Sequence, residues 1–173
     1  MTGESIDKEE LMSLFEAARW APSSYNGQPW RFVYAMRGTT QFETFFKLLT
    51  PGNQEWCKDA AVLVVTASRD TFEYNSKPER THTFDTGAAW ENIALQAAAR
   101  ELVVHAMEGF DYDKAAKVCK IPKGHTIEMM FAVGKRGSKD RLPERVREWE
   151  APNARKKVEE FAFEGVFKET KKK

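Results

Sequence analysis

Hydrophobic residues near the start of the chain recur every three or four positions, which is the spacing of one face of a helix. The recurring residues are Leu11, Leu14, Phe15 and Ala18. Asp7 and Glu10 stand at the spacing of a capping box, in which two side chains satisfy free backbone N–H groups of the first helical turn. We therefore predict a helix over about residues 8–20, with its apolar face in the core.

Beyond this helix, short β-branched and aromatic runs alternate with helical patterns. Strands are predicted at residues 31–35, 61–67, 103–107 and 127–134. Helices are predicted after Thr39 or Thr40 with an end at Pro51–Gly52, from Asp85 or Thr86 to about residue 98, and through Ala115, Ala116 and Val118. The polar residues 69–83 are predicted to form an excursion over the surface beside a functional site.

The order of these elements indicates a fold class. Residues 61–67 are continuously apolar, which is typical of a strand buried on both faces at the centre of a sheet. Alternating strands and helices predict a central sheet flanked by helices, an α+β fold with α/β/α layers. The chain has 173 residues, of which 42% are hydrophobic, so residues 1–173 are expected to form a single domain with a sizeable core.

Charge and composition exclude several classes of partner. Lys and Arg number 27 and Asp and Glu number 26, which leaves a net charge of +1 and no bulk attraction for nucleic acid or an anionic membrane. No apolar run approaches the length of a membrane span, so we expect a soluble, cytoplasmic protein. Cys57 and Cys119 form no Cys-x-x-Cys motif and the histidines lack ligand spacing, so free thiols and no zinc site are predicted.

Residues 21–32 join the first predicted helix to the first predicted strand and are unusually rich in side-chain hydrogen-bonding groups. Pro22 and Pro29 restrict the backbone at both ends of the segment, and each biases its preceding residue toward an extended conformation. The polar side chains between them are therefore held on a stiff backbone, which favours binding. An ordinary helix end followed by an Asn26-Gly27 turn is the alternative that the residue types alone allow.

Residues 21–30 read Ala-Pro-Ser-Ser-Tyr-Asn-Gly-Gln-Pro-Trp. This run closely resembles the entry signature of the FMN-dependent nitroreductase family, with eight matches in ten positions. The resemblance implies a nitroreductase-like fold with a mostly antiparallel sheet, assembled as a homodimer that holds FMN at its interface. It also implies that this loop lies along the flavin, commonly the one bound chiefly by the partner chain. The residues carried over as FMN contacts are Pro22, Ser23, Ser24, Asn26 and Gln28.

Two further places resemble the family's flavin site. Met107-Glu108-Gly109 matches a turn whose backbone N–H groups face flavin N5 and O4 in relatives, and Gly109 has no Cβ to obstruct the approach of the ring. Asn53 matches a cofactor-contacting asparagine. Trp56, three residues later, departs from the lysine that some relatives carry near the pyrimidine edge of the flavin.

The C-terminal segment 135–173 is highly charged and reads for the most part as solvated surface. Within it, Arg155 resembles the basic residue that relatives place on the flavin phosphate, with Lys156 behind it. The apolar residues near the end of the segment are expected to form an arm that packs against the partner subunit. They are Phe161, Phe163, Val166 and Phe167.

A departure at the N-terminus keeps two functions open. Family members usually carry an Arg-x-Ser-x-Arg segment before the first helix that grips the phosphate, whereas Met1–Glu9 contain no arginine. The resemblance implies an oxidoreductase that uses NAD(P)H to reduce a planar acceptor such as a nitroaromatic or quinone by a ping-pong mechanism. The alternative is a shortened, catalytically silent dimer that serves as a binding or interaction module and binds FMN weakly or not at all.

Overall fold

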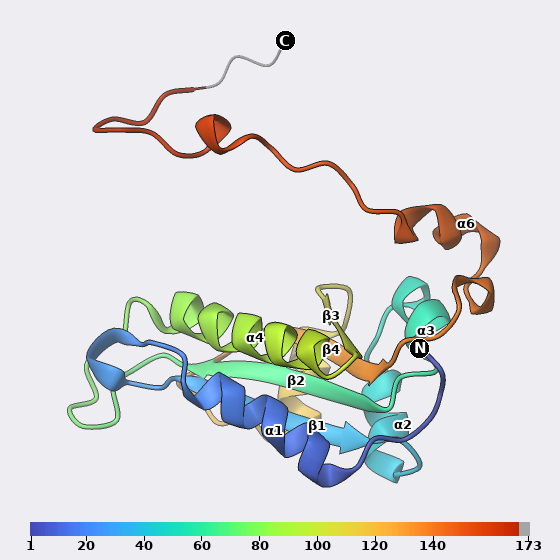
Figure 1. Ribbon diagram of the computed structural model, residues 1–173. Helices are drawn as coiled ribbons and strands as arrows, with labels where there is room; N and C mark the ends of the chain where they lie inside the picture. The colour runs from blue at the N-terminus through green and yellow to red at the C-terminus, as the bar shows by residue number, and fades with distance from the viewer. Residues whose placement is uncertain (170–173) are drawn as a thin grey trace.

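A computed structural model describes residues 1–169 as a four-stranded sheet with helices on both faces (Figure 1). The strands are β1 (Trp30–Met36), β2 (Val62–Arg69), β3 (Leu102–Met107) and β4 (His125–Lys135). They lie in the order β1-β2-β4-β3, and every neighbouring pair is antiparallel. The predicted antiparallel α+β architecture is confirmed.

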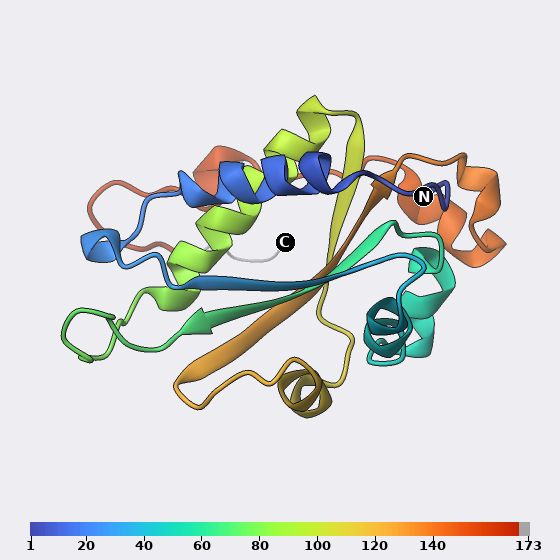
Figure 2. The same ribbon diagram turned by 90° about the horizontal axis from the view of Figure 1, so that it is seen from below.

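The helices divide between the two faces of the sheet (Figure 2). One face is covered by α1 (Lys8–Arg19) and α4 (His82–Ala99), and the other by α2 (Thr40–Phe46), α3 (Pro51–Cys57) and α5 (Tyr112–Val118). Two separate hydrophobic clusters follow from this layering, one on each side of the sheet. The central strand β2 contributes to both, and it is buried from Val62 to Ser68, as the continuous apolar run predicts.

Capping side chains set the start of several helices. Asp7 accepts a hydrogen bond from the Glu10 N–H at 2.6 Å, Thr39 caps α2, and Asp111 caps α5. The first helix and the second therefore begin where the sequence pattern places their starts.

Two predicted helix boundaries are wrong. Pro51 does not end a helix but begins α3, because proline lacks only an N–H that the first turn leaves unpaired in any case. The long helix α4 begins at His82 rather than at Asp85 or Thr86. The Asp85 side chain does not cap it, since its carboxylate bonds Ser24 and Thr81 instead.

Between β4 and residue 169 the chain forms only short helical turns. These are η2 (Lys139–Arg141), α6 (Glu144–Arg147), η3 (Glu148–Glu150) and η4 (Val158–Glu160). Residues 151–169 run away from the sheet (Figure 1), and Phe161, Val166 and Phe167 are exposed. Its packing as an arm on a partner subunit stays a prediction. Within residues 1–169 no helix is both long and apolar enough to cross a membrane.

Candidate functional site

The loop between α1 and β1 has an unusual backbone. It contains the short helical turn η1 (Ser24–Asn26), and three of its non-glycine residues adopt left-handed conformations. These are Tyr25 (φ 48°), Asn26 (φ 56°) and Gln28 (φ 47°). Left-handed non-glycine residues cost free energy and cluster at functional sites, where the surrounding structure imposes them. The loop is thus held in shape by its neighbours.

Specific hydrogen bonds fix the two ends of this turn. The Ser24 N–H donates to the Asp85 Oδ2 atom at 2.9 Å, and the Gln28 N–H donates to the Ser23 Oγ atom at 3.1 Å. The Asn26 side chain is exposed, and no hydrogen bond ties its amide to another described residue. The amide of Asn26 therefore remains available to a ligand.

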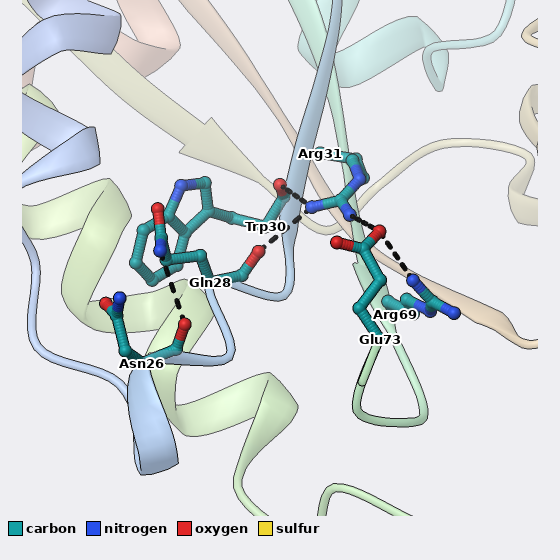
Figure 3. A network of polar contacts seen from close by, with 6 residues as sticks. All are labelled: Asn26, Gln28, Trp30, Arg31, Arg69 and Glu73. Atoms are coloured by element: carbon teal, nitrogen blue, oxygen red, sulfur yellow. Dashed lines mark hydrogen bonds and ion pairs between the residues drawn. The ribbon is translucent and has the colours of Figure 1, made fainter. Parts of the chain in front are cut away.

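The predicted excursion at residues 69–83 lies beside this loop. Glu73 bonds Arg69 at 2.6 Å and Arg31 at 3.4 Å, while Arg31 also donates to the carbonyl oxygens of Gln28 and Trp30 (Figure 3). These contacts fasten the excursion to the loop along a cavity of about 320 Å³.

A second, larger cavity of about 770 Å³ is lined by residues of the Glu-Gly turn and of α3. This size falls within the range of small-molecule sites, which is about 300–1,000 Å³. Asn53, Trp56, Met107, Glu108 and Gly109 all line it. The structure therefore brings together these predicted residues, although β2 and α4 separate them along the chain.

Asn53 links α3 to the Glu-Gly turn. Its Nδ2 atom donates to the Gly109 carbonyl oxygen at 2.9 Å, and its Oδ1 atom accepts from the Trp56 indole N–H at 3.1 Å. A Cβ atom on Gly109 would lie 2.9 Å from both Asn53 Nδ2 and Thr50 Oγ1. A larger residue at position 109 would therefore force the side chains of Asn53 and Thr50 to shift.

The Glu-Gly turn also leaves hydrogen-bond donors at the cavity. The N–H groups of Glu108 and Gly109 have no acceptor anywhere in residues 1–169, and both residues line the cavity. Two adjacent free backbone donors are the groups that bind a heterocyclic oxygen or nitrogen. The donor set therefore fits the edge of a flavin ring.

The same cavity is also lined by basic side chains from the segment that the sequence pattern assigns to solvated surface. They are Arg136, Lys139 and Arg145. Arg145 is paired with Glu55, whereas Arg136 and Lys139 have no carboxylate partner within the described residues. Unpaired cations on the same cavity as free N–H donors fit a phosphate-bearing ligand. Only the fold distinguishes them from the other charges of this segment.

Arg155 and Lys156 are not brought to either cavity of their own chain. The Arg155 guanidinium bonds only Asn153 and the Ala154 carbonyl oxygen, and both basic residues are exposed. A phosphate contact by Arg155 within one chain is therefore not supported by the structure. A contact across a dimer stays a prediction.

The loop at residues 22–28 and the Glu-Gly turn lie at opposite edges of the sheet. The loop leads into β1 and the turn follows β3, which are the two edge strands in the order β1-β2-β4-β3. Three strand spacings of about 4.8 Å, or roughly 14 Å, separate these edges, and no residue of the loop lines the larger cavity. The two groups of candidate residues therefore form two half-sites.

The fold and these half-sites define a class of α+β protein with a cofactor-sized cavity beside the sheet. The family model described as "Nitroreductase family" matches residues 2–135. The chain belongs to the nitroreductase family. Among characterised proteins, it is similar to Protein DrgA of Synechocystis, with 30% identity over 76% of this chain and 75% of that protein.

Solved structures support the same family. A crystal structure described as an oxidoreductase containing FMN is 40% identical, with a TM-score of 0.93 over 98% of this chain and 87% of that one. A structure described as a putative nitroreductase in complex with FMN, from Exiguobacterium sibiricum, is 19% identical, with a TM-score of 0.77 over 94% of this chain and 89% of that one. The second likeness shows the fold alone.

Proposed function

We propose that this protein is an FMN-dependent oxidoreductase. The observation that carries the proposal is the pair of free N–H groups at Glu108 and Gly109, which lie on a cavity of about 770 Å³ together with unpaired cations. The relative of 40% identity, whose structure is described as containing FMN, supports the same ligand.

In this proposal each part of the cavity holds one part of the cofactor. Glu108 and Gly109 donate backbone hydrogen bonds to the ring edge, with Asn53 fixing the turn that carries them. Arg136 and Lys139 supply positive charge to the phosphate. When bound, FMN supplies the hydride transfer, so no side-chain nucleophile is needed.

The second half-site comes from another copy of the chain. The loop lies at the opposite edge of the sheet and does not line this cavity in its own subunit, but a symmetric partner can present its own Ser23, Ser24 and Asn26 there. We therefore propose a homodimer with two shared sites. The exposed apolar residues of the C-terminal segment extend the surface available for this interface.

The proposed reaction follows a ping-pong order. NAD(P)H binds first and leaves as the oxidised nucleotide, and a planar, electron-poor acceptor such as a nitroaromatic or quinone then takes its place. Relatives named as putative NADH dehydrogenase/NAD(P)H nitroreductase, one of them from Rhodopseudomonas palustris at 28% identity, support a nicotinamide donor. The protein's task is to hold the ring accessible from one side.

The experiment that tests this function is titration of FMN into apo-protein, followed by the oxidation of NADH or NADPH with a nitroaromatic acceptor. A yellow protein that holds stoichiometric FMN, and parallel lines in double-reciprocal plots at several acceptor concentrations, would support the proposal. Absence of FMN binding at micromolar concentration would instead favour a silent family member.

A further inference from the structure

Glu79 is a buried carboxyl group without a hydrogen-bond partner. The residue is 1% exposed, and neither of its carboxyl oxygens bonds any described residue. Unpaired buried polar atoms are rare in folded proteins because they lose water without replacement. The burial of an unpaired carboxyl group at this cost in free energy requires a physical reason. None of the residues that are proposed above to contact FMN explains the burial of Glu79.

The position of Glu79 relative to Gly27 suggests that reason. A Cβ atom added to Gly27 would lie 2.6 Å from the Glu79 Oε1 atom and 3.0 Å from its Oε2 and Cδ atoms. No other atom comes nearer to that point. The carboxyl group of Glu79 therefore occupies the space directly beneath the loop.

Backbone conformation does not explain why position 27 is a glycine. Gly27 has φ −65° and ψ −28°, which any residue adopts, whereas its neighbours Asn26 and Gln28 carry the left-handed angles. A side chain at position 27 would therefore displace the Glu79 carboxyl group, whereas the dihedral angles of Gly27 place no demand for glycine.

We propose that Glu79 is a positioning residue: its buried carboxyl group packs under Gly27 and fixes the turn Tyr25–Gln28 in the shape that presents Asn26 to the flavin. This inference rests on the proposed function, since it assigns the turn to FMN. Asp85 contributes a second support from α4 by accepting the Ser24 N–H.

The charges around Glu79 favour its neutral form. Burial, and then the negative charge of Asp85, raise the pKa of Glu79 above the ordinary value of a glutamate, while His82 and Arg69 act in the opposite direction. A neutral carboxyl group can remain beneath the backbone, whereas an ionised one is repelled by Asp85 and drawn to water. The loop is therefore held best while Glu79 is protonated.

A double-mutant cycle tests the contact. We expect Gly27→Ala and Glu79→Ala each to weaken FMN binding about tenfold, because one overfills the space and the other empties it. In the double variant the new methyl group enters the vacated space, so we expect a loss near tenfold rather than the hundredfold of independent effects. Purely multiplicative losses would overturn the inference.

Glu79→Gln separates shape from charge, because glutamine matches the protonated carboxyl group in size. We expect this variant to bind FMN within about threefold of the parent at low pH. As the pH rises through the raised pKa of Glu79, FMN affinity of the parent should fall relative to the variant. Parallel pH profiles for the two proteins would contradict the role.

Hydrogen exchange in the apo-protein provides a readout that is independent of FMN. Loss of Glu79 should speed exchange of the Ser24 and Gln28 amides, whereas Glu43→Ala, on the exposed side of α2, should leave them unchanged. Unchanged exchange in Glu79→Ala would overturn the positioning role. If the parent does not bind FMN but Glu79→Ala still exchanges faster, the assignment of the turn to a flavin is rejected. The packing of Glu79 under Gly27 would then still stand.

Discussion

Replacement of Asn53 by alanine tests how the Glu-Gly turn is held. The change removes two hydrogen bonds, one from Asn53 Nδ2 to the Gly109 carbonyl oxygen and one from the Trp56 indole to Asn53 Oδ1. The Gly109 carbonyl keeps a second bond from the Thr50 N–H at 3.0 Å, so the turn is loosened but not released.

The cost follows from these two bonds. Each neutral hydrogen bond contributes about 1 kcal/mol, so Asn53→Ala should lower the free energy of unfolding by about 2 kcal/mol. For a chain of this size the melting temperature should fall by about 4–8 °C. Because the displaced turn carries the free N–H groups of Glu108 and Gly109, FMN affinity should fall about tenfold as well.

Urea unfolding of apo-protein and FMN titration measure the two effects separately. Trp56→Phe is the matched control, since it removes only the indole bond to Asn53 and keeps an aromatic ring beside His105, whose ring centroid lies 4.4 Å away. This control should lose about 1 kcal/mol and retain most of its FMN affinity. An Asn53→Ala variant with parental stability and lost FMN binding would refute the reasoning, because Asn53 would then contact the flavin directly.

Three further predictions concern the proposed site. Asn26→Ala should weaken FMN binding about tenfold without lowering the melting temperature, because its exposed amide bonds no described residue; thermal melts with FMN titration check this. Light scattering should give the mass of two 19.8 kDa chains, and a stable monomer at micromolar concentration would reject the shared site. Lys139→Ala should weaken FMN binding about 10- to 100-fold and leave riboflavin binding unchanged. Arg155→Ala should have this effect only if the C-terminal segment reaches the phosphate of the FMN that a partner subunit binds.

Local sequence patterns specify most of the regular structure and indicate the family. Leu11 and Leu14 at helical spacing, the Asp7 cap, and the apolar run of β2 are local patterns, and local patterns follow from backbone geometry and burial alone. The signature at residues 21–30 was equally readable, because it is contiguous in the chain. Pro51 was misread because proline both follows helices and begins them.

The arrangement of the half-sites depends on contacts between residues that are far apart in the sequence. Asn53 and Gly109 are 56 positions apart in the sequence and meet because α3 packs beside the end of β3. No local pattern encodes a contact over this sequence separation. Arg136 and Lys139 looked like any other charges of a solvated segment until the chain placed them on the cavity. Glu79 gave no signal within a polar excursion, since only packing reveals that a carboxyl group is buried beneath Gly27. Contacts between residues far apart in sequence depend on how whole elements pack, and side-chain chemistry at one position cannot specify them.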